Sequence, residues 1–187
     1  MPLKPNAAPD EYSSPFFVRN KEFCEKYEQF ILSLDGKVNG LYNAYSYNVL
    51  AEICRSSKWF FRIKKSTYTT SGNLFVSSKD EGLFLASQWS SNELGSGCPK
   101  FVIRRTRWLD FLRVSLFNDL WKLKDYSNYI IKCDEPSNFF ISKLNNILSD
   151  LYLNEKVFTI GYESPKLFID LRTDQIHKKE IMELLKI

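Results

Sequence analysis

The stretch that decides the fold is KWFFRIKKSTYT, residues 58–69. Large apolar side chains alternate with basic ones along its first half, which is the period of an extended strand with two unlike faces. The two faces would carry Trp59, Phe61 and Ile63 on one side and Phe60, Arg62 and Lys64 on the other. We therefore expect an amphipathic β-strand with one buried and one exposed face.

Further short strands are predicted downstream of this one. Residues 74–78, 83–89 and 101–105 are apolar runs separated by turn-forming or polar residues such as Ser71-Gly72-Asn73. The connections are too short for the crossover that parallel neighbours need. The sequence therefore predicts an antiparallel meander of four strands.

The last third of the chain predicts a second set of elements. A strand over residues 129–132 is followed by a helix that starts at Pro136-Ser137. Residues 157–162 and 167–171 form a predicted hairpin, and Asp174 is expected to cap a final helix. An antiparallel sheet covered by about four helices is an α+β architecture.

The first half of the chain predicts helices around this sheet. Residues 1–15 contain four prolines and little to bury, so we expect a flexible segment followed by a single α+β domain over residues 16–187. A first helix is expected from Asn20 to Asp35-Gly36, a second from about Asn43, and a third over residues 108–123.

The composition points to a folded protein of the cell interior. Of the 187 residues 44% are hydrophobic and 16% aromatic, too many for a disordered chain. We find neither a secretory signal nor a membrane-spanning run, so we expect a soluble, cytoplasmic protein. Its four cysteines are far apart in the sequence and are expected to be thiols. The net charge of +4 is mild and identifies no class of partner.

Common catalytic constellations each lack an essential residue. His177 is the only histidine, which disfavours serine or cysteine triads and histidine-rich zinc sites. Gly95-Ser96-Gly97 precedes a predicted strand, whereas phosphate-binding loops precede a helix. We predict no cofactor, no metal site and no catalytic residue. An alternative is a Mg²⁺-dependent hydrolase or nuclease, in which Asp170 and Arg172 share a strand face and Asp134 or Glu135 supplies a second carboxylate.

The basic strands are the candidate binding site. If residues 58–69 and 101–105 are neighbouring strands, their basic side chains would form one patch beside an aromatic ring. The predicted binding residues are Phe60, Arg62, Lys64, Lys100, Arg104 and Arg105.

Such a face predicts a non-catalytic binding protein of the toxin-neutralising or accessory-subunit type, with a protein as its partner. The alternative on the same face is a binder of single-stranded nucleic acid or of a phosphorylated ligand.

Overall fold

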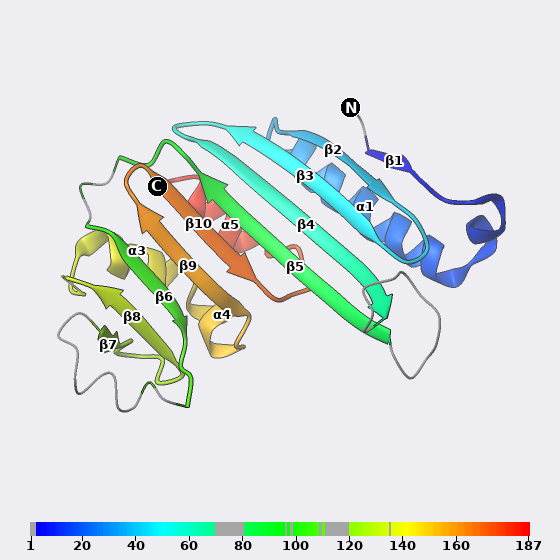
Figure 1. Ribbon diagram of the computed structural model, residues 1–187. Helices are drawn as coiled ribbons and strands as arrows, with labels where there is room; N and C mark the ends of the chain where they lie inside the picture. The colour runs from blue at the N-terminus through cyan, green and yellow to red at the C-terminus, as the bar shows by residue number, and fades with distance from the viewer. Residues whose placement is uncertain are drawn as a thin grey trace. The chain divides into compact units, whose positions relative to one another are not determined.

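The computed structural model describes residues 3–69, 81–95, 97, 99–108, 110, 120–134 and 136–187. Their strands form one ten-stranded sheet in the order β1-β2-β3-β4-β5-β10-β9-β6-β8-β7 (Figure 1). Four α-helices are present in this part of the chain. The predicted α+β class is confirmed. The sheet has more strands than a meander and a hairpin would give, and it is mixed, because β1 pairs with β2 in parallel.

Two compact units divide the chain, and each is described by itself. The first unit comprises Met1–Cys54, Trp59–Gln88 and Thr173–Ile176, and the second comprises Arg55–Lys58, Trp89–Arg172 and His177–Ile187. Within residues 1–15, for which the sequence predicts a flexible segment, the structure contains the strand β1 (Leu3–Pro5) and the 3-10 helix η1 (Pro9–Ser13).

The hairpin of β2 (Lys37–Tyr42) and β3 (Tyr47–Cys54) corrects one prediction, because it replaces the helix expected from Asn43. Buried and more exposed residues alternate along β3, which is the period of a strand. The turn depends on Asn43, whose Oδ1 accepts hydrogen bonds from the backbone N–H groups of Tyr45 and Ser46. Asparagine stabilises turns in this way, and that chemistry outweighs the local helical spacing.

The strand β4 (Lys58–Thr69) has the predicted bounds, and β5 (Glu81–Ser91) contains the predicted strand over residues 83–89. The strand expected over residues 74–78 lies outside the described residues. Helix α1 (Pro15–Leu32) begins before the expected Asn20, with Ser14 at its N-cap.

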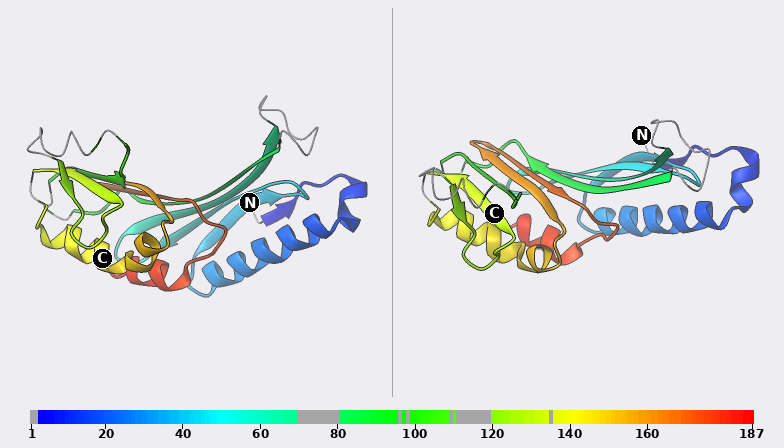
Figure 2. Two further views of the ribbon diagram at one scale, coloured as in Figure 1. Left: turned by 90° about the horizontal axis from the view of Figure 1, so that it is seen from below. Right: turned by 60° about the horizontal axis from the view of Figure 1, so that its bottom comes forward.

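One face of the first unit's strands is covered by α1 (Figures 1 and 2). Its buried residues are Phe17, Asn20, Cys24, Tyr27, Phe30 and Ile31. The hydroxyl of Tyr27 donates a hydrogen bond to the carbonyl oxygen of Phe61 on β4, over 2.9 Å. The side chain of Lys65 on β4 reaches Asn20 of α1, which identifies the side of β4 that faces the helix.

The second unit is built around β6 (Phe101–Arg105), which pairs with β8 (Tyr129–Cys133) and β9 (Val157–Glu163). The predicted hairpin of β9 and β10 (Lys166–Leu171) is confirmed. Of the helix predicted over residues 108–123, most lies outside the described residues. Its last part instead forms the strand β7 (Leu120–Lys122), which pairs with β8.

The helices of the second unit are α3 (Phe139–Ile147), α4 (Ser149–Leu153) and α5 (Lys178–Leu184). They lie on one face of this unit's strands (Figure 2). The helix predicted from Pro136 is thus present but divided in two. Helix α5 follows His177 and not the predicted cap Asp174. Within the described part of the chain, we find no helix with both the length and the apolar character needed to span a bilayer.

Candidate binding face

The two faces of β4 differ as the sequence predicts. Trp59, Phe61 and Ile63 are at most 3% exposed and share the face of β4 from which Lys65 reaches α1. On the opposite face Arg62 and Lys64 are exposed and Phe60 is partly exposed. The exposed face of the strand therefore combines two cations with an aromatic ring.

The neighbouring strands extend this surface with apolar side chains. Leu41 of β2 is 51% exposed, and Leu50 of β3 and Phe84 of β5 are partly exposed. Leu50 belongs to the face turned away from α1, because buried residues alternate with it along β3. Leu41 pairs in register with Asn48 of that same face, and the Phe84 ring lies under the ammonium of Lys64. We call this surface the open face and define it by Leu41, Leu50, Phe60, Arg62, Lys64 and Phe84.

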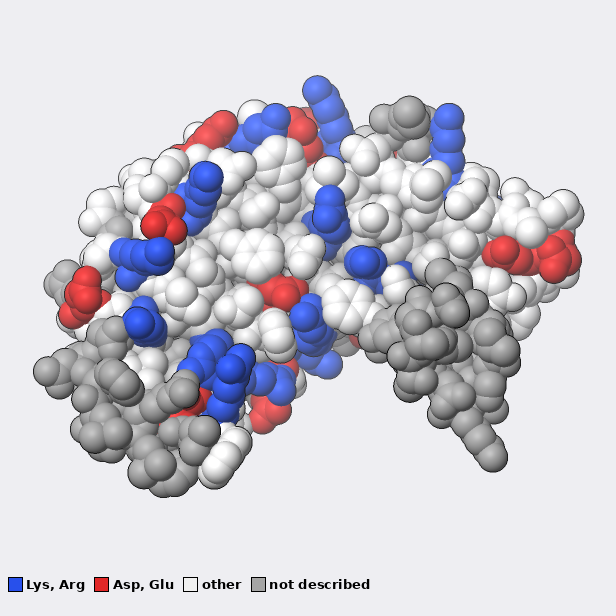
Figure 3. All heavy atoms as spheres, viewed as in Figure 1, with Lys and Arg blue, Asp and Glu red and all other residues white. Residues whose placement is uncertain are grey.

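Positive charge predominates on the open face. The ammonium of Lys64 lies over the ring of Phe84, with Nζ 5.7 Å from its centroid. Arg62 forms no ion pair with any described residue. The carboxylate of Glu52 is on the same face, but in register it lies directly opposite Lys37. Figure 3 views this side of the first unit, where Lys and Arg stand on the surface and Asp and Glu lie toward its margins.

The other predicted binding residues belong to a different part of the sheet. Three strands, β5, β10 and β9, lie between β4 and β6 in the strand order. β4 and β6 are therefore not neighbours, and their basic side chains do not form the single patch that the sequence predicts. The structure brings Phe60, Arg62 and Lys64 together and does not bring Lys100, Arg104 and Arg105 next to them.

Lys100, Arg104 and Arg105, at or next to β6, each pair with an acidic side chain. Arg104 forms a bidentate pair with Asp110, with distances of 2.7 and 2.9 Å from Nη1 and Nη2 to the two carboxylate oxygens. These hydrogen bonds raise the pKa of Arg104. Lys100 lies 3.0 Å from Glu163 and Arg105 lies 3.5 Å from Glu155, both at exposed sites. Because Asp110 is 2% exposed, the Arg104 pair is a structural element that holds the segment after β6.

Asp170 and Asp134 of the predicted hydrolase site do not converge, and the alternative Glu135 lies outside the described residues. In register, Asp170 of β10 is level with Thr159 of β9, Arg104 of β6 and Ile130 of β8. Asp134 follows β8 four residues beyond Ile130. Three strand spacings and four residues of strand separate the two backbone positions by roughly 20 Å, too far for a shared Mg²⁺ ion.

The carboxylate of Asp170 is held within its own strand. It accepts a hydrogen bond over 3.0 Å from Arg172, whose guanidinium lies 4.2 Å from the ring centroid of Phe158. His177 precedes α5, and its ring contacts Trp89 edge-on. In the described residues, no three His, Cys, Asp or Glu side chains are grouped as metal ligands.

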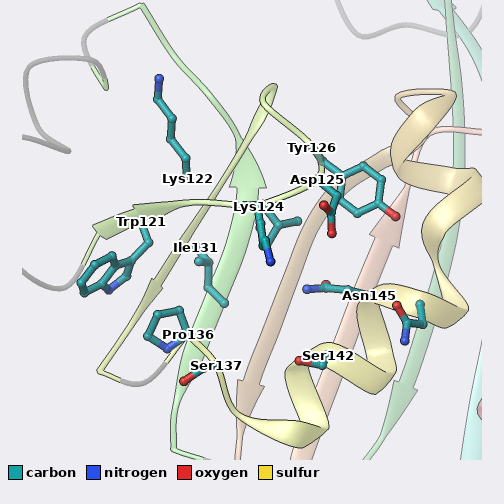
Figure 4. A pocket seen from close by; sticks show the side chains of 12 residues that line it. Trp121, Lys122, Lys124, Asp125, Tyr126, Ile131, Pro136, Ser137, Ser142 and Asn145 are labelled. Atoms are coloured by element: carbon teal, nitrogen blue, oxygen red, sulfur yellow. The ribbon is translucent and has the colours of Figure 1, made fainter.

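A cavity of about 520 Å³ lies in the second unit, between β7, β8 and α3 (Figure 4). Its wall carries groups of both charges, including Lys124 and Asp125. The ammonium of Lys124 points toward α3, whereas that of Lys122 points away. The size suits a small molecule, but the mixed lining selects no particular ligand class.

The sequence prediction missed the apolar part of the open face. Leu50 falls in the helix expected from about Asn43, and no strand is predicted over Leu41, so the sequence assigns neither residue to a strand face. For Leu50, the signal is the alternation of Tyr47, Val49, Ala51 and Ile53 with the polar Asn48 and Glu52.

Comparison with known proteins leaves the family of the chain undetermined. No family model matches the sequence, and no curated protein is similar enough to count as a relative.

Proposed function

We propose that this protein is a non-catalytic binding protein that holds an acidic protein partner on the open face. The observation that supports it is the contrast between the two sides of the first unit's strands. One side is buried under α1, whereas the other leaves aromatic, aliphatic and basic side chains accessible. Contiguous apolar surface surrounded by polar groups is typical of interaction sites.

A protein fits this surface better than a single-stranded nucleic acid. Nucleic-acid grooves carry a track of cations and aromatic rings that are open for stacking bases. Here Lys64 already occupies one side of the Phe84 ring, and Lys37 is opposite a carboxylate. Leu41 and Leu50 offer aliphatic contact area, which apolar side chains of a protein would cover.

The cations define the partner's charge. Arg62 and Lys64 are two residues apart on the same face of β4, so their side chains stand about 7 Å apart at the backbone. Carboxylates on the partner would pair with them, with apolar residues between that cover Phe60 and Leu50. Such complementary charges fix the register of an interface and raise its association rate.

Photocrosslinking in the native cells tests this assignment. Benzoylphenylalanine would replace Phe60 on the open face and, as a matched control, Phe16, which is 61% exposed on α1 in the same unit. We expect a discrete, nuclease-resistant protein adduct from position 60 and none from position 16. An adduct that nuclease removes would show that the partner is nucleic acid and not a protein. The same adducts from both positions would contradict specific binding at the open face.

A further inference from the structure

Two cations converge on a small cavity on the α1 side of the first unit, away from the open face. The cavity measures about 120 Å³. Its lining residues are Arg19, Asn20, Phe23, Tyr47, Lys65, Leu85 and Asp174. Lys65 follows Lys64 on β4 and therefore points to the opposite face, toward the helix.

The ammonium of Lys65 is held in place by a buried side chain. Its Nζ donates to Oδ1 of Asn20 over 2.9 Å. Asn20 is 2% exposed, and its Nδ2 donates to the carbonyl oxygens of Asn43 and Ala44 over 2.8 and 3.1 Å. Because these bonds fix the orientation of the amide, the position of Lys65 at the cavity is set by the fold.

The positive charge at the cavity is not balanced by an ion pair. Neither Arg19 nor Lys65 has a carboxylate oxygen within 4 Å in the described residues, although Asp174 contributes to the wall. Burial, and next the charge of Arg19, lower the pKa of Lys65. The neighbouring Tyr47 and Cys24 are neutral at physiological pH, because burial raises the pKa of both.

We propose that this cavity binds a phosphate group between Arg19 and Lys65, over the stacked rings of Phe23 and Tyr47. Those rings have centroids 5.2 Å apart and form an apolar wall. The volume is that of about four water molecules, which suits one tetrahedral oxyanion group. An anion there would pair with both cations and offset the cost of placing them together.

NMR spectroscopy of the full chain tests this site, with the lysine side-chain signals assigned. Inorganic phosphate would be titrated against sodium chloride of equal ionic strength. We expect a saturable shift of the Lys65 signals with phosphate, together with a rise of the Lys65 pKa. Absence of a saturable shift, or equal shifts at many lysines, would overturn the proposal.

Variants test whether phosphate binds at this cavity. Arg19→Gln, at an exposed position, should weaken phosphate binding at least fivefold, and Asp174→Asn, also exposed, should strengthen it. Lys26→Gln, on the solvent-exposed side of α1, is the matched control and should change nothing. Binding that is unaffected by Arg19→Gln would overturn the assignment even if Lys65 variants fail to fold.

Comparing inorganic phosphate with a phosphate monoester distinguishes a site for the free ion from a site for the phosphate group of a larger molecule. If the site takes the phosphate of a larger molecule, O-phosphoserine should bind at least as tightly as inorganic phosphate. If it takes the free ion, the added substituent should weaken binding. This site shares neither Arg62 nor Lys64 with the open face, so Arg62→Glu with Lys64→Glu should leave phosphate binding intact.

Discussion

Removing Arg104 should destabilise the protein more than the loss of a surface charge would. Its partner Asp110 is 2% exposed and accepts two hydrogen bonds from Arg104, at 2.7 and 2.9 Å, as well as one from the backbone N–H of Arg107 at 2.6 Å. Arg104→Ala removes the bidentate ion pair from this buried carboxylate. Breaking a buried ion pair in this way costs about 3–5 kcal/mol.

The stability cost of Arg104→Ala should be below that of breaking a fully buried pair, because the Arg104 side chain is 25% exposed and water can reach the pair. We expect about 2–3 kcal/mol for Arg104→Ala, after discounting for solvent screening. Asp110→Ala should cost only about 1–2 kcal/mol, since a partly exposed guanidinium can be hydrated in place of its partner. The double variant should resemble Asp110→Ala, which gives a coupling energy equal to the cost of Arg104→Ala, about 2–3 kcal/mol.

Urea unfolding of the four proteins measures these values, with equal m-values as the check that only stability has changed. Arg104→Lys is the matched control for charge, because lysine keeps the cation but cannot form the bidentate pair. A loss below about 0.5 kcal/mol for Arg104→Ala, or single-variant costs that simply add, would refute the reasoning.

Two further predictions concern stability. Gly40→Ala should cost more than about 2 kcal/mol of stability, because a Cβ there would lie 2.5 Å from the backbone oxygen of Asn48. Gly161→Ala is the control and should be tolerated, because open space surrounds its Cβ. Equal urea midpoints for the two variants would contradict this prediction. Burial raises the pKa of Cys24 from 9.0 to about 12, so the folded state keeps a proton that the unfolded state releases above pH 9, and stability is lost as pH rises toward 12. Cys24→Ala lacks this thiol, so its unfolding free energy should fall less steeply with rising pH than that of the wild type, by up to about 1.4 kcal/mol per pH unit. Parallel profiles of unfolding free energy between pH 9 and 11 would rule out this role.

Several strands could be predicted because their sequence signals are local. The bounds of β4 and β6 follow from alternation, and the β9–β10 hairpin follows from two apolar runs around a proline turn. The helix predicted from Asn43 is wrong because the local turn chemistry of Asn43 is reinforced by tertiary contacts. Its turn is held by Asn20 of α1 and by the carboxylate of Glu11, which lie far away in the sequence.

The candidate site could be predicted only strand by strand. Alternation assigns Phe60, Arg62 and Lys64 to one face, and the structure confirms that arrangement. Strand order is a long-range property, so the sequence could not show that β9, β10 and β5 separate β4 from β6. Nor could it show that Arg104 is paired with a buried carboxylate, because the burial of Asp110 depends on the packed fold.

The most direct test of an acidic partner on the open face is a charge reversal. The yield of the adduct from benzoylphenylalanine at position 60 would be compared between the parent chain and a variant carrying Arg62→Glu and Lys64→Glu. Lys21→Glu with Lys26→Glu, on the exposed side of α1, is the matched control. We predict a loss of about tenfold or more in the first variant, equivalent to ~1.4 kcal/mol or more, and little change in the control. An unchanged yield in the first variant, or an equal loss in both, would contradict the proposed binding face.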